Sequence, residues 1–137
     1  MGHGRRSAIV TDRLDMTFLA ARTAPGQVRT LVDLRLASWG LAGLRDDVAL
    51  IASELVTNAI LHTPEQQIRV QFTREPCGVL LMVWDSSDAL PVRKPPMHTA
   101  PMRADGRGLP IVEALSSKCG ISPTRPCGKW IWARVLA

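Results

Sequence analysis

The stretch Ser53-Glu54-Leu55-Val56-Thr57-Asn58-Ala59-Ile60-Leu61-His62 decides how this chain is interpreted. Glu54, Asn58 and His62 stand four residues apart, and residues four apart on an α-helix lie one above the other, so these polar side chains form one row. Most other residues of the stretch are apolar, which predicts a largely buried helix. Burying three polar side chains without partners is costly, so we expect a polar ligand to face the row, and a magnesium nucleotide would suit it.

A plainer interpretation of this row stays open. A single buried asparagine or histidine is usually a core residue whose hydrogen bonds are satisfied within the protein. Three polar residues at helical spacing, one of them a glutamate, make a binding site an equally good interpretation.

The segments around this stretch predict an α+β fold. The helix begins near Asp46 and ends at His62, because Thr63-Pro64 cannot continue it. The other expected elements are a strand over 14–21, a helix over 27–39, strands over 67–73 and 79–84, a helix over 109–118 ended by Cys119-Gly120, and one or two final strands that include 130–136. This order predicts a two-layer sandwich in which the helices cover one face of a mixed or antiparallel sheet.

Length and composition favour a single domain. The chain has 137 residues, 46% of them hydrophobic, so we expect a flexible tail over residues 1–13 and one packed domain over residues 14–137. We find neither an apolar run long enough to span a membrane nor a secretory signal, and therefore expect a cytoplasmic protein with no membrane partner. The three cysteines form no CxxC pair and are expected to be reduced thiols.

The net charge of +5 raises a nucleic-acid hypothesis that other features oppose. Nucleic-acid binding usually requires a patch or stripe of basic residues, whereas the arginines of this chain are scattered along it. Aromatic residues, on which bases could stack, make up 4% of the sequence. We therefore expect no direct binding of nucleic acid.

Asp85 and a pair of glycines add two possible nucleotide contacts. Asp85 ends the most apolar predicted strand, and its carboxylate can accept a hydrogen bond from the exocyclic amine of adenine. Gly106-Arg107-Gly108 precedes a helix expected to begin at Leu109, and free N–H groups at a helix start attract phosphate. Each feature alone has an ordinary explanation, a turn-forming aspartate or a loop glycine. Their combination with the polar row favours nucleotide binding.

Three segments together resemble the GHKL (Bergerat-fold) ATPases, and more closely the small anti-sigma-factor and serine-protein-kinase branch common in actinobacteria. They are Glu54 to His62, Trp84-Asp85, and Gly106-Arg-Gly108-Leu-Pro-Ile-Val. The resemblance extends from about Leu14 to Val135. It implies an ATP site between the helices and the loop before Gly106, with the segment 86–105 acting as a lid.

The resemblance also implies a role for each site residue. Asn58 would ligate Mg²⁺ through its carbonyl oxygen, and Glu54 would be the general base that takes the proton of a partner's serine or threonine hydroxyl. Asp85 would read adenine. The other expected nucleotide contacts are His62, Ser87, Gly106, Arg107, Gly108 and Leu109, the two glycines holding phosphates through their N–H groups. Phosphoryl transfer does need a metal, positioning and a carboxylate near the nucleophile.

Two residues depart from the pattern of the resembling family. Ser87 stands where a glycine is usual, and we expect its side chain to narrow the adenine end of the site. Trp130 stands where a threonine usually assists adenine recognition. We expect its indole either to turn into the core or to crowd the base.

The main hypothesis is an ATP-binding, anti-sigma-factor-like regulatory serine/threonine kinase in a partner-switching system. Its expected partners are a sigma factor, an anti-anti-sigma-type antagonist that it phosphorylates, or both, and a homodimer is possible. The alternative is a catalytically weak or inactive protein-binding module that keeps the fold. Hydrolysis of ATP without a protein acceptor is also open, because the same carboxylate could activate water.

Overall fold

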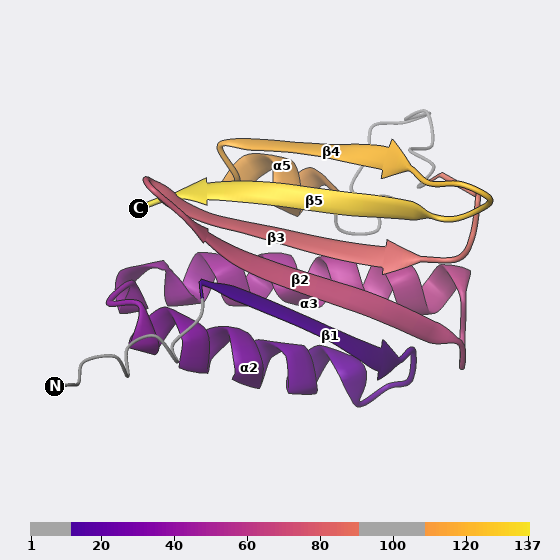
Figure 1. Ribbon diagram of the computed structural model, residues 1–137, viewed down its shortest axis with the longest axis horizontal. Helices are drawn as coiled ribbons and strands as arrows, with labels where there is room; N and C mark the ends of the chain where they lie inside the picture. Colours follow the sequence, from indigo (N-terminus) through magenta and orange to yellow (C-terminus); the bar gives the residue numbers. More distant parts are fainter. Residues whose placement is uncertain (1–11, 91–108) are drawn as a thin grey trace, which may run out of the picture.

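The computed structural model describes residues 12–90 and 109–137 (Figure 1). The elements are β1 (Arg13–Leu19), α2 (Ala24–Ser38), the 3₁₀ turn η1 (Ala42–Leu44), α3 (Arg45–His62), β2 (Gln67–Glu75), β3 (Gly78–Asp85), α5 (Leu109–Leu115), β4 (Lys118–Pro123) and β5 (Lys129–Leu136). The tail expected over residues 1–13 lies outside the described residues except for its last two, and Arg13 already belongs to β1. Within the described ranges no helix is long and apolar enough to cross a membrane.

The sheet has five strands in the order β1-β2-β3-β5-β4, and every neighbouring pair is antiparallel. Helix α3 packs between α2 and α5 and contacts β3 and β5, so the helices form a second layer on one side of the sheet (Figure 1). The expected α+β sandwich is confirmed, and the sheet is antiparallel throughout. The apolar strand β3 lies at the centre of the sheet, and its buried residues are those that face the helices.

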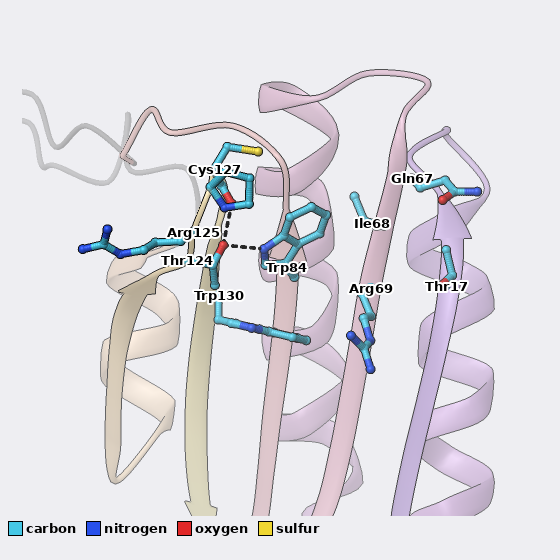
Figure 2. A pocket seen from close by; sticks show the side chains of 10 residues that line it. Thr17, Gln67, Ile68, Arg69, Trp84, Thr124, Arg125, Cys127 and Trp130 are labelled. Carbon is cyan, nitrogen blue, oxygen red and sulfur yellow. Dashed lines mark hydrogen bonds between the residues drawn. The ribbon is translucent and has the colours of Figure 1, made fainter.

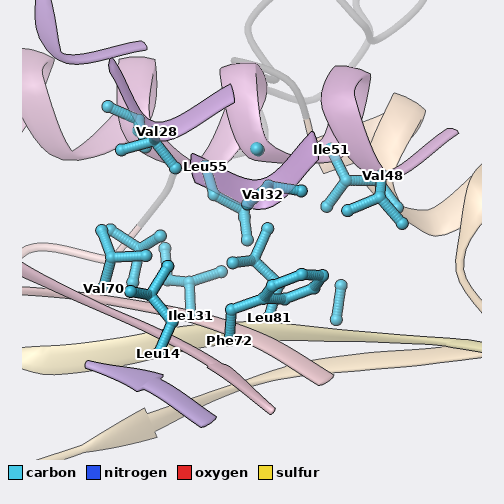
Figure 3. Packing of buried hydrophobic residues seen from close by; sticks show 14 of the residues in the cluster. Leu14, Val28, Val32, Val48, Ile51, Leu55, Val70, Phe72, Leu81 and Ile131 are labelled. Atoms are coloured by element: carbon cyan, nitrogen blue, oxygen red, sulfur yellow. The ribbon is translucent and has the colours of Figure 1, made fainter. Parts of the chain in front are cut away.

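The core lies between α3, α2 and the helix-facing side of the sheet (Figure 3). Alternate residues of each strand point into it because successive side chains of a strand face opposite sides. In β2 these are Ile68, Val70 and Phe72, and Phe72 also packs against Trp39 with their ring centroids 5.1 Å apart. The same alternation places Asp85 of β3 and Lys129 of β5 on the helix-facing side, at the end of the sheet where both are buried.

The C-terminal third differs from the sequence prediction at one place. The helix expected over 109–118 ends at Leu115, and Cys119-Gly120, expected to end it, lies inside β4. The Ser117 backbone N–H donates to the Arg134 carbonyl (2.8 Å), so pairing with β5 begins directly after the helix. Gly120 serves the sheet: a Cβ there would come within 2.6 Å of the Trp132 indole.

Candidate functional site

Asn58, in the middle of the polar row of α3, is buried and has no hydrogen-bond partner among the residues that the structure describes. Its exposed fraction is 1%, and neither Oδ1 nor Nδ2 has a partner among the described residues. A buried polar atom left unpaired costs about 1–3 kcal/mol of folding free energy. A ligand or a water molecule could supply the missing hydrogen bonds or coordinate the oxygen.

Glu54 and His62 extend the row by one turn in each direction, as the spacing predicts. Both side chains are half-buried, so the row runs from the protein surface through the buried Asn58 to the end of the sheet. His62 Nδ1 lies 3.3 Å from the Lys129 ammonium. An ammonium group can only donate hydrogen bonds, so this contact is a hydrogen bond in the tautomer that leaves Nδ1 as the acceptor.

Asp85 and Lys129 form an ion pair at the end of the sheet, and each side chain is 1% exposed. The Lys129 ammonium donates to Asp85 Oδ1 over 2.7 Å, and the Ser87 backbone N–H donates to the same oxygen over 2.9 Å. Lys129 also donates to the Ser87 carbonyl at 3.2 Å. Together with the His62 contact, these bonds join the ends of β3 and β5 to the last turn of α3.

Gly128 brings the segment before β5 against the segment after β3. Its φ is +91°, and a Cβ there would lie 2.6 Å from the Asp85 carbonyl oxygen, so only glycine fits without strain. Its N–H donates to the Asp88 carboxylate over 2.9 Å. The carboxylates of Asp85 and Asp88 therefore hold two successive residues, Lys129 and Gly128.

The backbone of Ser87 does not have the positive φ that would require glycine at this position. Among the described residues Glu65 is the sole non-glycine with a positive φ, so Ser87 adopts a backbone conformation open to any residue. Its hydroxyl accepts a hydrogen bond from the Ala89 N–H over 3.0 Å. The expectation that the Ser87 side chain narrows the adenine end of the site stays a prediction.

Trp130 does not turn into the core, which was one of its two expected placements. Strand alternation points it away from the core, to the outer face of the sheet, while Lys129 and Ile131 on either side of it point inward. The Arg69 guanidinium lies 5.9 Å from the centre of the Trp130 ring. With Trp84, Trp130 lines an outer cavity of about 460 Å³ (Figure 2). The indole therefore does not fill the core, and the expectation that it crowds the base stays a prediction.

Lys129 is the site residue that the sequence analysis missed. The final strand was expected to begin at Trp130, which left the lysine outside it. The inward-facing residues of this strand are Ile131, Ala133 and Val135, spaced by two. Continuing the same spacing towards the N-terminus leads to Lys129, so the alternation could have predicted a buried lysine. A lysine at such a position needs a carboxylate partner, and Asp85 pairs with it in the β3–β5 register.

The expected phosphate contacts are only partly placed. Gly106, Arg107, Gly108 and the lid from residue 91 onward lie outside the described residues. The backbone of Leu109 begins α5, which packs against α3. The expected contacts of these residues with the nucleotide therefore stay predictions.

The oxygen atoms of the site suit a magnesium ion that is bound mainly by a nucleotide. The described ranges hold no group of three or more His, Cys, Asp or Glu side chains that could enclose a metal. Mg²⁺ usually takes one or two protein oxygens and completes its shell with phosphate and water. The unpartnered Asn58 Oδ1, one turn from the Glu54 carboxylate, fits that requirement.

Comparison with known proteins agrees with this geometry. Residues 19–135 match the family model described as a histidine kinase-like ATPase domain. No curated protein matches the chain. The matched range includes the whole polar row, Asp85 and Lys129. The chain therefore belongs to the histidine kinase-like ATPase domain family, and this membership implies that it binds ATP.

Proposed function

We propose that this protein is a regulatory serine/threonine kinase of the anti-sigma-factor type, which uses magnesium ATP to phosphorylate an antagonist protein. The observation that carries the proposal is the unpartnered, buried Asn58, with Glu54 one turn away on the same row. A core asparagine with satisfied hydrogen bonds would have pointed to a structural role. A sigma factor is the proposed second partner, bound or released according to the antagonist's phosphorylation.

The nucleotide would lie along α3, from the end of the sheet towards Glu54. Asp85, held by Lys129 and the Ser87 N–H, would accept a hydrogen bond from the adenine amine. Asn58 Oδ1 would be the protein's ligand to Mg²⁺. When bound, the ion neutralises charge on the phosphate oxygens.

Glu54 is suited to act on the incoming hydroxyl. Its carboxylate is half-buried and makes no hydrogen bond or ion pair with another described residue, so it is available to a substrate. In the proposed step it takes the proton of the antagonist's serine or threonine hydroxyl. The hydroxyl oxygen then bonds to the γ-phosphorus, the bond to the β-phosphate oxygen breaks, and ADP leaves.

A module that binds its partner without transferring phosphate is the second candidate. The Lys129–Asp85 ion pair favours it, because an ammonium on the aspartate competes with a nucleobase for that carboxylate. Under this alternative Asp85 and Lys129 stabilise the end of the sheet, and the polar row has no catalytic role.

Phosphate transfer to a candidate antagonist separates the two functions. We expect the wild-type protein with γ-labelled ATP and Mg²⁺ to label the antagonist on serine or threonine. Glu54→Gln should abolish labelling and still bind ATP, because it removes the proton acceptor and keeps the shape. Asp46→Asn, an exposed carboxylate in the first turn of α3, is the matched control and should leave labelling intact. Labelling that persists in Glu54→Gln would contradict the proposed role of that residue.

A further inference from the structure

Lys129 is buried to an extent that folding alone does not explain. Its ammonium and the Asp85 carboxylate are each 1% exposed. A buried ion pair is generally no more stabilising than a well-packed apolar pair of similar volume, because both charges lose their hydration. Stability alone therefore does not account for the burial of this pair.

The bonds to Asp85 are distributed unevenly between its two oxygens. The Lys129 ammonium and the Ser87 N–H both donate to Oδ1, and neither uses Oδ2. The ammonium is itself fixed from the other side by the Ser87 carbonyl and by His62 Nδ1 of α3. These hydrogen bonds hold Oδ1 in place and thereby fix the direction in which Oδ2 points.

We propose that Lys129 is a positioning residue that keeps Asp85 ionised and oriented, so that the site selects purines with an amino group at position 6 over those with an oxo group. This inference rests on the proposed nucleotide site. An ionised carboxylate can only accept hydrogen bonds, so it pairs with a 6-amino group and opposes a 6-oxo oxygen. A site built around one polar group discriminates strongly against an analogue that cannot pair with it.

Removal of the ammonium should change what Asp85 can recognise. A buried carboxylate without a counter-charge favours its neutral form and takes up a proton. The resulting O–H can donate to a 6-oxo oxygen, and the remaining carbonyl oxygen can still accept from a 6-amino group. Lys129 therefore affects the choice of base in addition to any effect on overall affinity.

Titration with magnesium ATP and magnesium ITP, which differ at purine position 6, tests this inference. For wild type we expect a preference for ATP of at least about tenfold in Kd, the effect of one hydrogen bond to a charged group. Lys129→Met should lose most of that preference. Lys118→Met is the control: it removes an exposed lysine from the neighbouring strand β4 and should leave the preference for ATP unchanged.

Lys129→Gln is a second variant that keeps the test decisive if Lys129→Met does not fold. Glutamine can still donate to Asp85 but carries no charge, so the preference for ATP should again fall. If both nucleotides weaken equally in the two Lys129 variants and the preference is unchanged, Lys129 is only structural and the inference is overturned. Wild-type protein that binds neither nucleotide would refute the proposed nucleotide site itself, which is a separate outcome.

Discussion

Asn58 lies in the core with both amide atoms unpartnered among the described residues. A residue selected for stability alone would be apolar at this position, since α3 presents Leu55 and Ala59 to the same core. We therefore expect the amide to lower the stability of the fold, a cost that the proposed ligand role would explain. This conflict between folding and binding can be measured at a single residue.

Asn58→Leu should raise the free energy of unfolding by about 1–3 kcal/mol, because it removes unsatisfied buried polar atoms and keeps a similar volume. Chemical denaturation of the nucleotide-free protein measures this. Thr57→Leu, at the exposed neighbouring position of α3, is the control and should change stability little. A less stable Asn58→Leu would mean that the amide already has hydrogen-bond partners within the protein.

Gly128→Ala should destabilise the protein by about 1–3 kcal/mol, the usual cost of a non-glycine residue in the left-handed region. The contact between a Cβ and the Asp85 carbonyl adds to this cost. Gly43→Ala is the matched control: φ is not positive there and a Cβ would meet nothing within 4 Å, so it should be neutral or slightly stabilising. Thermal unfolding of both variants tests the difference, and equal stabilities would contradict it.

At the scale of elements, the sequence predicts α3 and the inner strands well because their apolar periodicity is strong. Helix α3 was expected to run from near Asp46 to His62 and does so within one residue. The error at Cys119-Gly120 arose because glycine both ends helices and packs under large rings in sheets. The indole above Gly120 comes from β5, which local sequence does not reveal.

The part of the candidate site that depends on local sequence could be predicted, and the part that depends on long-range packing could not. Glu54, Asn58 and His62 follow from local helical spacing. The contact of Lys129 with Asp85 and His62 depends on strand register and on how α3 packs on the sheet, both of which are long-range properties. The direction of Trp130 likewise depends on which residue begins β5.

An ion pair between Asp15 and Arg69 links the edge strand β1 to β2, and the Asp15 carboxyl should take up a proton in acid. The Arg69 guanidinium forms two hydrogen bonds with Asp15, and Gln71 Nε2 donates a third. The hydrogen bond from Arg69 is the largest effect that lowers the pKa of the Asp15 carboxyl, and burial opposes it. A lowered pKa in the folded state stabilises the protein above the unfolded-state pKa of about 4.

Asp15→Asn should therefore be less stable than wild type at neutral pH. The difference should close as the pH falls below about 4 and through the lowered folded-state pKa, where wild type also loses the charge. Denaturation curves at several pH values measure it. Asp12→Asn, in a longer and more exposed pair with Arg74, should show a smaller difference. A difference that persists at the lowest pH would contradict the assignment to Asp15.

At the scale of the whole molecule, the sheet separates two surfaces with different chemistry. The helix-facing side carries Asp85 and Lys129 at its end, and the outer side carries Trp84 and Trp130 around a cavity (Figure 2). The two surfaces lie on opposite sides of the same strands. Changes on the outer side should therefore leave nucleotide binding largely unaffected.

Trp130→Thr, which restores the residue usual in the resembling family, tests this separation. We expect the Kd for magnesium ATP to change by no more than about twofold, as for independent sites. Calorimetric titration measures the affinity. A large gain in affinity would show that the indole does obstruct the nucleobase.

In the proposed function, the polar row of α3 faces a magnesium nucleotide. Calorimetric titration of magnesium ATP into wild type and Asn58→Leu tests it most directly, with folding of the variant verified by circular dichroism. We expect wild type to bind in a magnesium-dependent manner and the folded variant to lose at least about tenfold in affinity, because a ligand of the ion has been removed. Equal magnesium-dependent affinity in the two proteins would contradict it.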